Sequence, residues 1–131
     1  MLDKPPVLLR RALWLDAVGS GGLALPLVVA SGPLAPVLSL PAELLQGVGI
    51  FLVLWVGAVL LIVTREPSPR LPVVAVVAFN AVWVVASFGA LAGGSVAPNA
   101  LGLVFVVGQA LAVAGFAALQ VLGLRAAASK G

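Results

Sequence analysis

The 131-residue sequence is 63% hydrophobic and only 8% charged, with a mean hydropathy of +1.26 and a formal net charge of +3. Because soluble domains are about 25% charged, this composition excludes an ordinary soluble domain, and its apolar content excludes a disordered chain. The sequence has no His, Cys or Tyr. A histidine-ligated haem, a thiolate metal site, a disulfide and a cysteine or histidine catalytic group are therefore excluded. We expect no cofactor and no enzymatic activity.

Four apolar runs follow one another along the chain, each long enough to cross a hydrocarbon layer of about 30 Å. The runs are continuously apolar, which favours helices over the alternating strands of a barrel. Pro41 and Pro72 stand where a first helical residue belongs, because proline has no N–H to leave unpaired there. The expected fold is an all-α, up-down-up-down four-helix transmembrane bundle, forming a single integral membrane domain over residues 1–131. We predict the four helices at residues 12–30, 41–63, 72–91 and 100–124.

The segments between the spans are short. Ser31-Gly32-Pro33 and Gly93-Gly94-Ser95 are typical of helix breaks after the first and third spans. The apolar segment 34–40 is too short to span, so we expect it to lie at the membrane surface. Residues 64–70 form a short, polar, proline-containing connector, which predicts that the second and third spans are antiparallel neighbours.

The basic residues indicate the orientation of the chain. All seven precede the first span, separate the second from the third, or follow the fourth, and they are Lys4, Arg10, Arg11, Arg65, Arg70, Arg125 and Lys130. Because positive loops stay cytoplasmic, both termini should face the cytoplasm. The positive charge thus needs no nucleic-acid partner, and it would also attract anionic lipid head groups.

A cleaved signal peptide is a competing interpretation of the first span. Arg10-Arg11, an apolar stretch and Val28-Val29-Ala30 follow the order of such a peptide. Asp16 interrupts the apolar stretch, which is also long for a signal peptide. The other three spans would keep their orientation in either case.

Polar side chains inside the spans need an explanation, since charged and amide groups are costly in hydrocarbon. Asp16 and Gln120 each lie five residues from a flanking arginine, about 7–8 Å inside the boundary at a helical rise of about 1.5 Å per residue. Asn80 and Gln109 each lie ten residues from a span boundary, so they should be about 15 Å deep, near the midplane.

Helical spacing places these residues in stripes that should face the bundle interior. We predict a cytoplasmic layer containing Asp16, Ser20 and Gln120, and a central layer containing Asn80, Ser87 and Gln109. The layers can be read in two ways: as interhelical hydrogen bonds that fix helix register, or as a proton or substrate pathway in which Asp16 titrates. We interpret the deep tryptophans, Trp55 and Trp83, as packing residues rather than a ligand cage.

With these residues placed, the chain resembles a group of uncharacterised small four-helix integral membrane proteins of high-GC bacteria. The resemblance runs nearly full length, and its most specific segments are Asp16-Ala17, Leu40-Pro41-Ala42, Asn80-Ala81-Val82-Trp83, Gln109-Ala110 and Leu119-Gln120. It implies a multi-pass protein of the bacterial inner membrane and brings no activity with it. The small multidrug-resistance transporters are similar in size only, because their essential acid is a glutamate deeper in the first helix and their basic bias is weak.

Two functions of different class remain open. The first is a non-enzymatic accessory or assembly subunit of a membrane complex, in contact with the lipid bilayer and with other membrane subunits or further copies of itself. It follows from the lack of reactive side chains and from loops too short to hold a site outside the membrane. The alternative is a small homo-oligomeric transporter or permeation element that uses Asp16, Ser20, Asn80 and Gln109, with Asp16 as the proton- or cation-linked residue.

Overall fold

The computed structural model describes residues 7–64 and 70–129, and all secondary structure in these ranges is helical. The helices are α1 (Val7–Val29), α2 (Ser31–Leu38), α3 (Ala42–Val63), α4 (Arg70–Ala92) and α5 (Ala100–Ser129). The four long helices are long and apolar enough to cross a membrane, which confirms four apolar candidate spans. The observed helix bounds differ most from the predicted ones at the two ends of the bundle sequence. Helix α1 begins five residues earlier than predicted, and α5 ends five residues later.

The short helix α2 corrects the prediction of only four helices. The chain bends at Ala30, which has φ −127° and ψ 27°, and Ser31 already begins α2. The predicted break after the first span is confirmed, because α1 ends at Val29, but the same triplet also starts α2: Pro33 lies in its first turn, where a missing N–H costs no hydrogen bond. The helix ends at Leu38, because Ser39 adopts the left-handed φ of 54°.

Asn99 connects α2 to the start of α5. Its side-chain amide donates to the carbonyl of Val37 over 2.8 Å, and its Oδ1 accepts from the backbone N–H of Gly102 over 2.8 Å, as an N-cap does. Gly102 itself lies against the carbonyl of Leu38, where a Cβ would collide. The short helix is therefore held against the first turn of α5.

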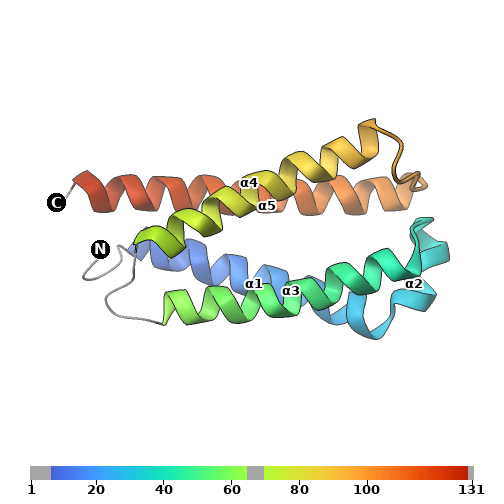
Figure 1. The fold of residues 1–131 in the computed structure, drawn as a ribbon, viewed down its shortest axis with the longest axis horizontal. Coiled ribbons are helices and arrows are strands. Elements are labelled where there is room, and N and C mark those ends of the chain that lie inside the picture. The colour runs from blue at the N-terminus through green and yellow to red at the C-terminus, as the bar shows by residue number, and fades with distance from the viewer. Residues whose placement is uncertain (1–6, 65–69, 130–131) are drawn as a thin grey trace.

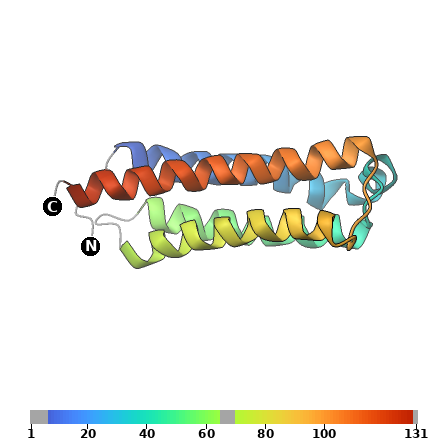
Figure 2. The same cartoon turned by 90° about the horizontal axis from the view of Figure 1, so that it is seen from above.

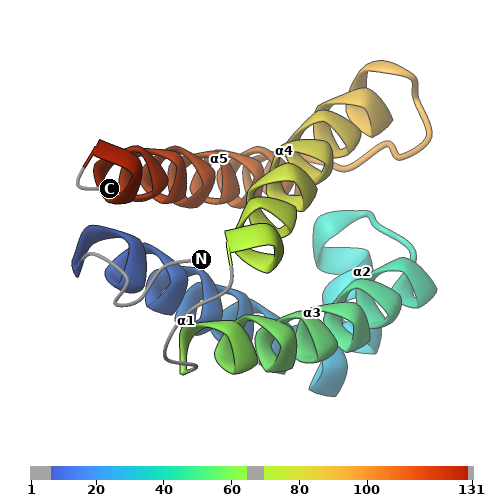
Figure 3. The ribbon, with the colours of Figure 1, turned by 60° about the vertical axis from the view of Figure 1, so that its left-hand side comes forward.

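The long helices form two closely packed pairs (Figures 1 and 2). Helix α3 packs on α1 and α4 packs on α5, while α1 and α5 join the pairs. Helices α3 and α4 were expected to be neighbours. Their backbones come close at few positions, and the two helices diverge toward the end of α4 (Figure 3). The connector 65–69 lies outside the described residues.

Large aromatic side chains explain the wide spacing of α3 and α4. Phe51 and Trp55 from α3 stack with Phe79 and Trp83 from α4, with ring centroids 4.9–5.6 Å apart across the two helices. Interaxial distance depends on the side chains at the contact, so four rings hold these backbones apart while still filling part of the space.

The two ends of the bundle differ in charge. Helices α1 and α4 begin, and α3 and α5 end, at the same end of the molecule (Figure 1), and we call it the basic end because Arg10, Arg11, Arg70 and Arg125 belong to these helix ends. Lys4, Arg65 and Lys130 lie outside the described residues. Leu9, Leu13, Val59, Val63 and Val73 belong to the core cluster of the basic end. A second core cluster, toward α2, includes Leu27, Leu38, Leu40, Leu45 and Leu52.

Candidate functional site

The carboxylate of Asp16 is the centre of a buried polar cluster. Its Oδ1 accepts from the Ser20 hydroxyl and from the Trp55 indole N–H, each over 3.1 Å. Its Oδ2 accepts from the amide nitrogens of Asn80, at 2.8 Å, and Gln120, at 2.9 Å. The Asn80 amide also donates to Gln120 Oε1 over 3.1 Å. We call these five residues the Asp16 cluster.

The donors match the chemistry of the carboxylate. Both side-chain oxygens of Asp16 accept, and an indole N–H and an amide nitrogen can only donate, so every hydrogen bond around Asp16 joins a donor to an acceptor. All four partners are neutral side chains. Asp16, Asn80 and Gln120 are 1%, 3% and 0% exposed, so the carboxylate and both of its amide partners are buried.

Each of the four long helices contributes to the Asp16 cluster. Asp16 and Ser20 come from α1, Trp55 from α3, Asn80 from α4 and Gln120 from α5. The one group that accepts from all of them is the carboxylate. The hydrogen bonds to the carboxylate therefore fix the register of all four helices at one level.

Small residues allow the close approach of α1 and α5 beside this cluster. A Cβ at Gly123, three residues beyond Gln120, would lie 2.6 Å from the Leu9 Cα, and a Cβ at Gly19 would lie 2.9 Å from the Phe116 ring. Glycine at these positions lets Gln120 reach Asp16 across the interface.

A second polar group lies further from the basic end. The Trp83 indole donates to Gln109 Oε1 over 2.8 Å, and Gln109 Nε2 donates to Ser87 Oγ over 3.1 Å and to the Val106 carbonyl over 2.9 Å. The Ser87 hydroxyl donates to the Trp83 carbonyl over 2.8 Å. These side chains are half-buried, unlike those of the Asp16 cluster. We call Trp83, Ser87 and Gln109 the Gln109 group.

The assignment of Asn80 to the central layer is wrong. The structure places Asp16, Ser20 and Gln120 together, and Ser87 with Gln109, but it moves Asn80 to the Asp16 cluster. Depth counted from flanking arginines assumes that each arginine marks the end of a helix. Arg11 and Arg125 instead lie inside α1 and α5, so Asp16 and Gln120 are each nine residues from a helix end, almost as far as Asn80, which is ten residues from the start of α4.

Sequence reasoning missed the hydrogen-bonding roles of Trp55 and Trp83. Both rings do pack, as expected, but each indole N–H also donates to one of the polar side chains. A signal was present, because an indole N–H deep in hydrocarbon needs an acceptor. Asp16 and the glutamine carbonyls are among the acceptors that the spans offer.

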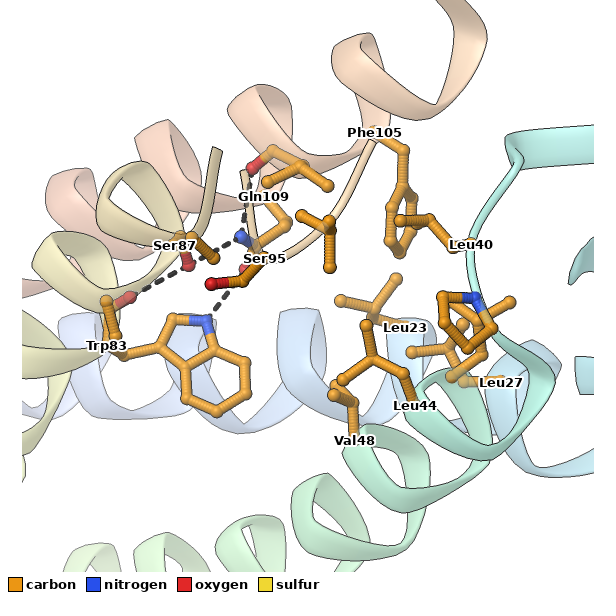
Figure 4. Close-up of a pocket in the computed structure, with 16 residues that line it drawn as sticks. Leu23, Leu27, Leu40, Leu44, Val48, Trp83, Ser87, Ser95, Phe105 and Gln109 are labelled. Carbon is orange, nitrogen blue, oxygen red and sulfur yellow. Dashed lines mark hydrogen bonds between the residues drawn. The ribbon is translucent and has the colours of Figure 1, made fainter. Parts of the chain in front are cut away.

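Two larger cavities and one of about 20 Å³ adjoin the polar residues. The outer cavity, of about 550 Å³, lies where α3 and α4 diverge, and the Gln109 group forms its polar wall (Figure 4). The inner cavity, of about 220 Å³, is lined by Ser20 as well as by Trp83 and Gln109. Leu23, Trp83 and Gln109 line both, so these residues stand between the outer cavity and the surroundings of Ser20.

The described residues offer hydrogen bonds and apolar surface rather than a metal or cofactor set. The sequence lacks His and Cys, and in the part of the chain that the structure describes no three carboxylates come together. Comparison with known proteins gives no family model, no curated protein and no solved structure that matches the chain. The function must therefore be argued from the geometry.

Proposed function

We propose that this protein is a non-enzymatic accessory or assembly subunit of a complex in the bacterial inner membrane. The observation that carries the proposal is the burial of the Asp16 carboxylate among hydrogen-bond donors. The carboxylate, the only acid in the central part of the spans, accepts four hydrogen bonds from neutral side chains and lines neither of the two larger cavities. A group so occupied serves the assembly of the bundle rather than chemistry on a substrate.

The topology that goes with this proposal is up-down-up-down across the bilayer, with both termini cytoplasmic. Its support is the gathering of Arg10, Arg11, Arg70 and Arg125 toward one end of the bundle, since basic residues are retained on the cytoplasmic side. The large apolar side chains that the bundle leaves exposed, such as Leu25, Leu54 and Val85, are then covered by lipid or by partner subunits.

Gentle extraction from native membranes tests the proposal. The complex is sized in mild detergent and its components are identified by mass spectrometry, with an unrelated small four-helix membrane protein, tagged and extracted identically, as the control. We expect a defined heteromeric complex that the control lacks. A lone, stable monomer would overturn the proposal.

One observation favours transport as a second candidate. The outer cavity lies where α3 and α4 diverge, and the inner cavity, separated from it by Trp83 and Gln109, reaches Ser20, whose hydroxyl is bonded to Asp16. In this reading the chain forms a homo-oligomeric transporter or permeation element, and Asp16 is its proton- or cation-linked residue.

Flux in reconstituted vesicles distinguishes the two functions. If transport is correct, Asp16→Asn abolishes a pH-dependent flux, whereas Gln46→Ala, an exposed position near the start of α3, leaves it intact. Size-exclusion profiles must match that of the wild type for both variants. An unchanged flux in Asp16→Asn would remove the coupling role of the carboxylate.

A further inference from the structure

The outer cavity has the size and layout of a small-molecule site. Its volume of about 550 Å³ falls within the roughly 300–1,000 Å³ of ligand pockets. Polar side chains lie on one side, and Leu27, Leu40, Leu44 and Phe105 lie on the other (Figure 4). No charged residue lines the cavity. A matching ligand is therefore uncharged, polar at one end and apolar along the rest.

The hydrogen bonds of the Gln109 group decide which polar end fits. The Trp83 N–H, both Gln109 Nε2 donations and the Ser87 hydroxyl are already directed at protein acceptors. Because the indole can only donate, it also fixes which end of the Gln109 amide faces it. The group thus has no hydrogen left to offer a ligand.

Acceptor capacity does remain. A carbonyl oxygen and a hydroxyl oxygen each have two lone pairs, and one on Gln109 Oε1 and one on Ser87 Oγ are used. A ligand that donates a hydrogen bond gains a partner here, whereas a ligand that only accepts meets no donor from these three side chains.

The geometry points to a binding site for a neutral amphiphile that carries a hydroxyl or similar donor at one end of an aliphatic body. Its donor bonds to Gln109 Oε1 or Ser87 Oγ, and its body lies among the leucines and Phe105. The ligand enters between α3 and α4, because the backbones of these two helices are far apart and leave the cavity open there. In a membrane this opening faces the bilayer, in which such molecules dissolve. The site is independent of whether the protein is a subunit or a transporter.

A matched pair of probes tests the donor requirement. 2-Bromo-1-decanol and its methyl ether have the same apolar body, and their bromine, next to the polar end, lies near Trp83 and quenches its emission. In detergent we expect saturable quenching, with the alcohol binding about fivefold tighter than the ether, the effect of one neutral hydrogen bond. Equal affinity for the two probes, or no saturable quenching, would overturn the proposal.

Three variants locate the binding. Ala86→Phe fills the cavity that Ala86 lines and should abolish saturable quenching, while Ala81→Phe, on an exposed part of the same helix outside the lining, should preserve it. Ser95, an exposed cavity residue, is the remaining hydroxyl of the lining, and Ser95→Ala should keep the preference for the alcohol. Binding that survives in Ala86→Phe, or a preference lost in Ser95→Ala, would contradict the assigned site.

Discussion

The two polar groups of this bundle represent opposite ways of placing polar side chains among apolar helices. The Asp16 cluster has a buried carboxylate at its centre and draws donors from all four long helices. The Gln109 group contains only neutral side chains, joins α4 to α5 and borders a cavity of about 550 Å³. The comparison indicates that the basic end holds the bundle together and that the other end has room to bind.

Replacing Asp16 should have the largest effect on the stability of the bundle. Asp16→Leu leaves the donors of Trp55, Asn80 and Gln120 without their acceptor in a buried site. We expect a loss of about 3 kcal/mol in the free energy of unfolding, measured by denaturant titration in mixed micelles. The exposed control Gln46→Leu should change it little. A loss in Asp16→Leu as small as that of the control would show that the cluster does not hold the bundle together.

Close helix approach at the basic end is tested by adding one methyl group. Gly123→Ala places a Cβ 2.6 Å from the Leu9 Cα, and the resulting overpacking should cost about 2 kcal/mol. Gly108→Ala, on the same helix with nothing within 4 Å of its Cβ, should be neutral or stabilise by up to about 1 kcal/mol. The same denaturant titration compares them, and equal effects on the free energy of unfolding would refute the tight α1–α5 contact.

The two glutamines of α5 allow a direct comparison of the groups. Met has nearly the shape of Gln, so Gln120→Met and Gln109→Met remove hydrogen bonds while largely preserving volume. We expect Gln120→Met to cost about 1 kcal/mol more, because Gln120 is 0% exposed and bonds to the carboxylate, whereas Gln109 is half-buried. The reverse order in unfolding free energy would mean that the cavity wall is the more rigid region.

Filling the cavity should have the smallest effect. Ala90 lines the outer cavity, so Ala90→Leu should change the unfolding free energy by no more than about 0.5 kcal/mol, in the stabilising direction. Ala110, on α5, is 0% exposed, and Ala110→Leu should destabilise by about 1–3 kcal/mol. A comparable loss of unfolding free energy in both variants would show that the cavity collapses in the folded protein.

Much of the local structure could be predicted from the sequence, because it depends on properties of contiguous segments. Long apolar runs set the four long helices, and the break at Gly93-Gly94-Ser95 was recognisable from its glycines, of which Gly94 has φ 74°. Helix α2 was missed because Pro33 can begin a helix as readily as follow one. The polar residues of the candidate site were identifiable, since any polar side chain in an apolar span needs a partner.

Which polar residues meet was decided only by the tertiary structure. The sequence by itself determined that Asp16, Asn80, Gln109 and Gln120 lie within apolar helices. The observed helix ends and the packing of α1, α4 and α5 then placed Asn80 at the level of Asp16, and the rings between α3 and α4 kept those helices apart and left the outer cavity open. Helical periodicity fixes the face on which a residue lies, but tilt and spacing depend on the side chains of other helices, which are distant in the chain.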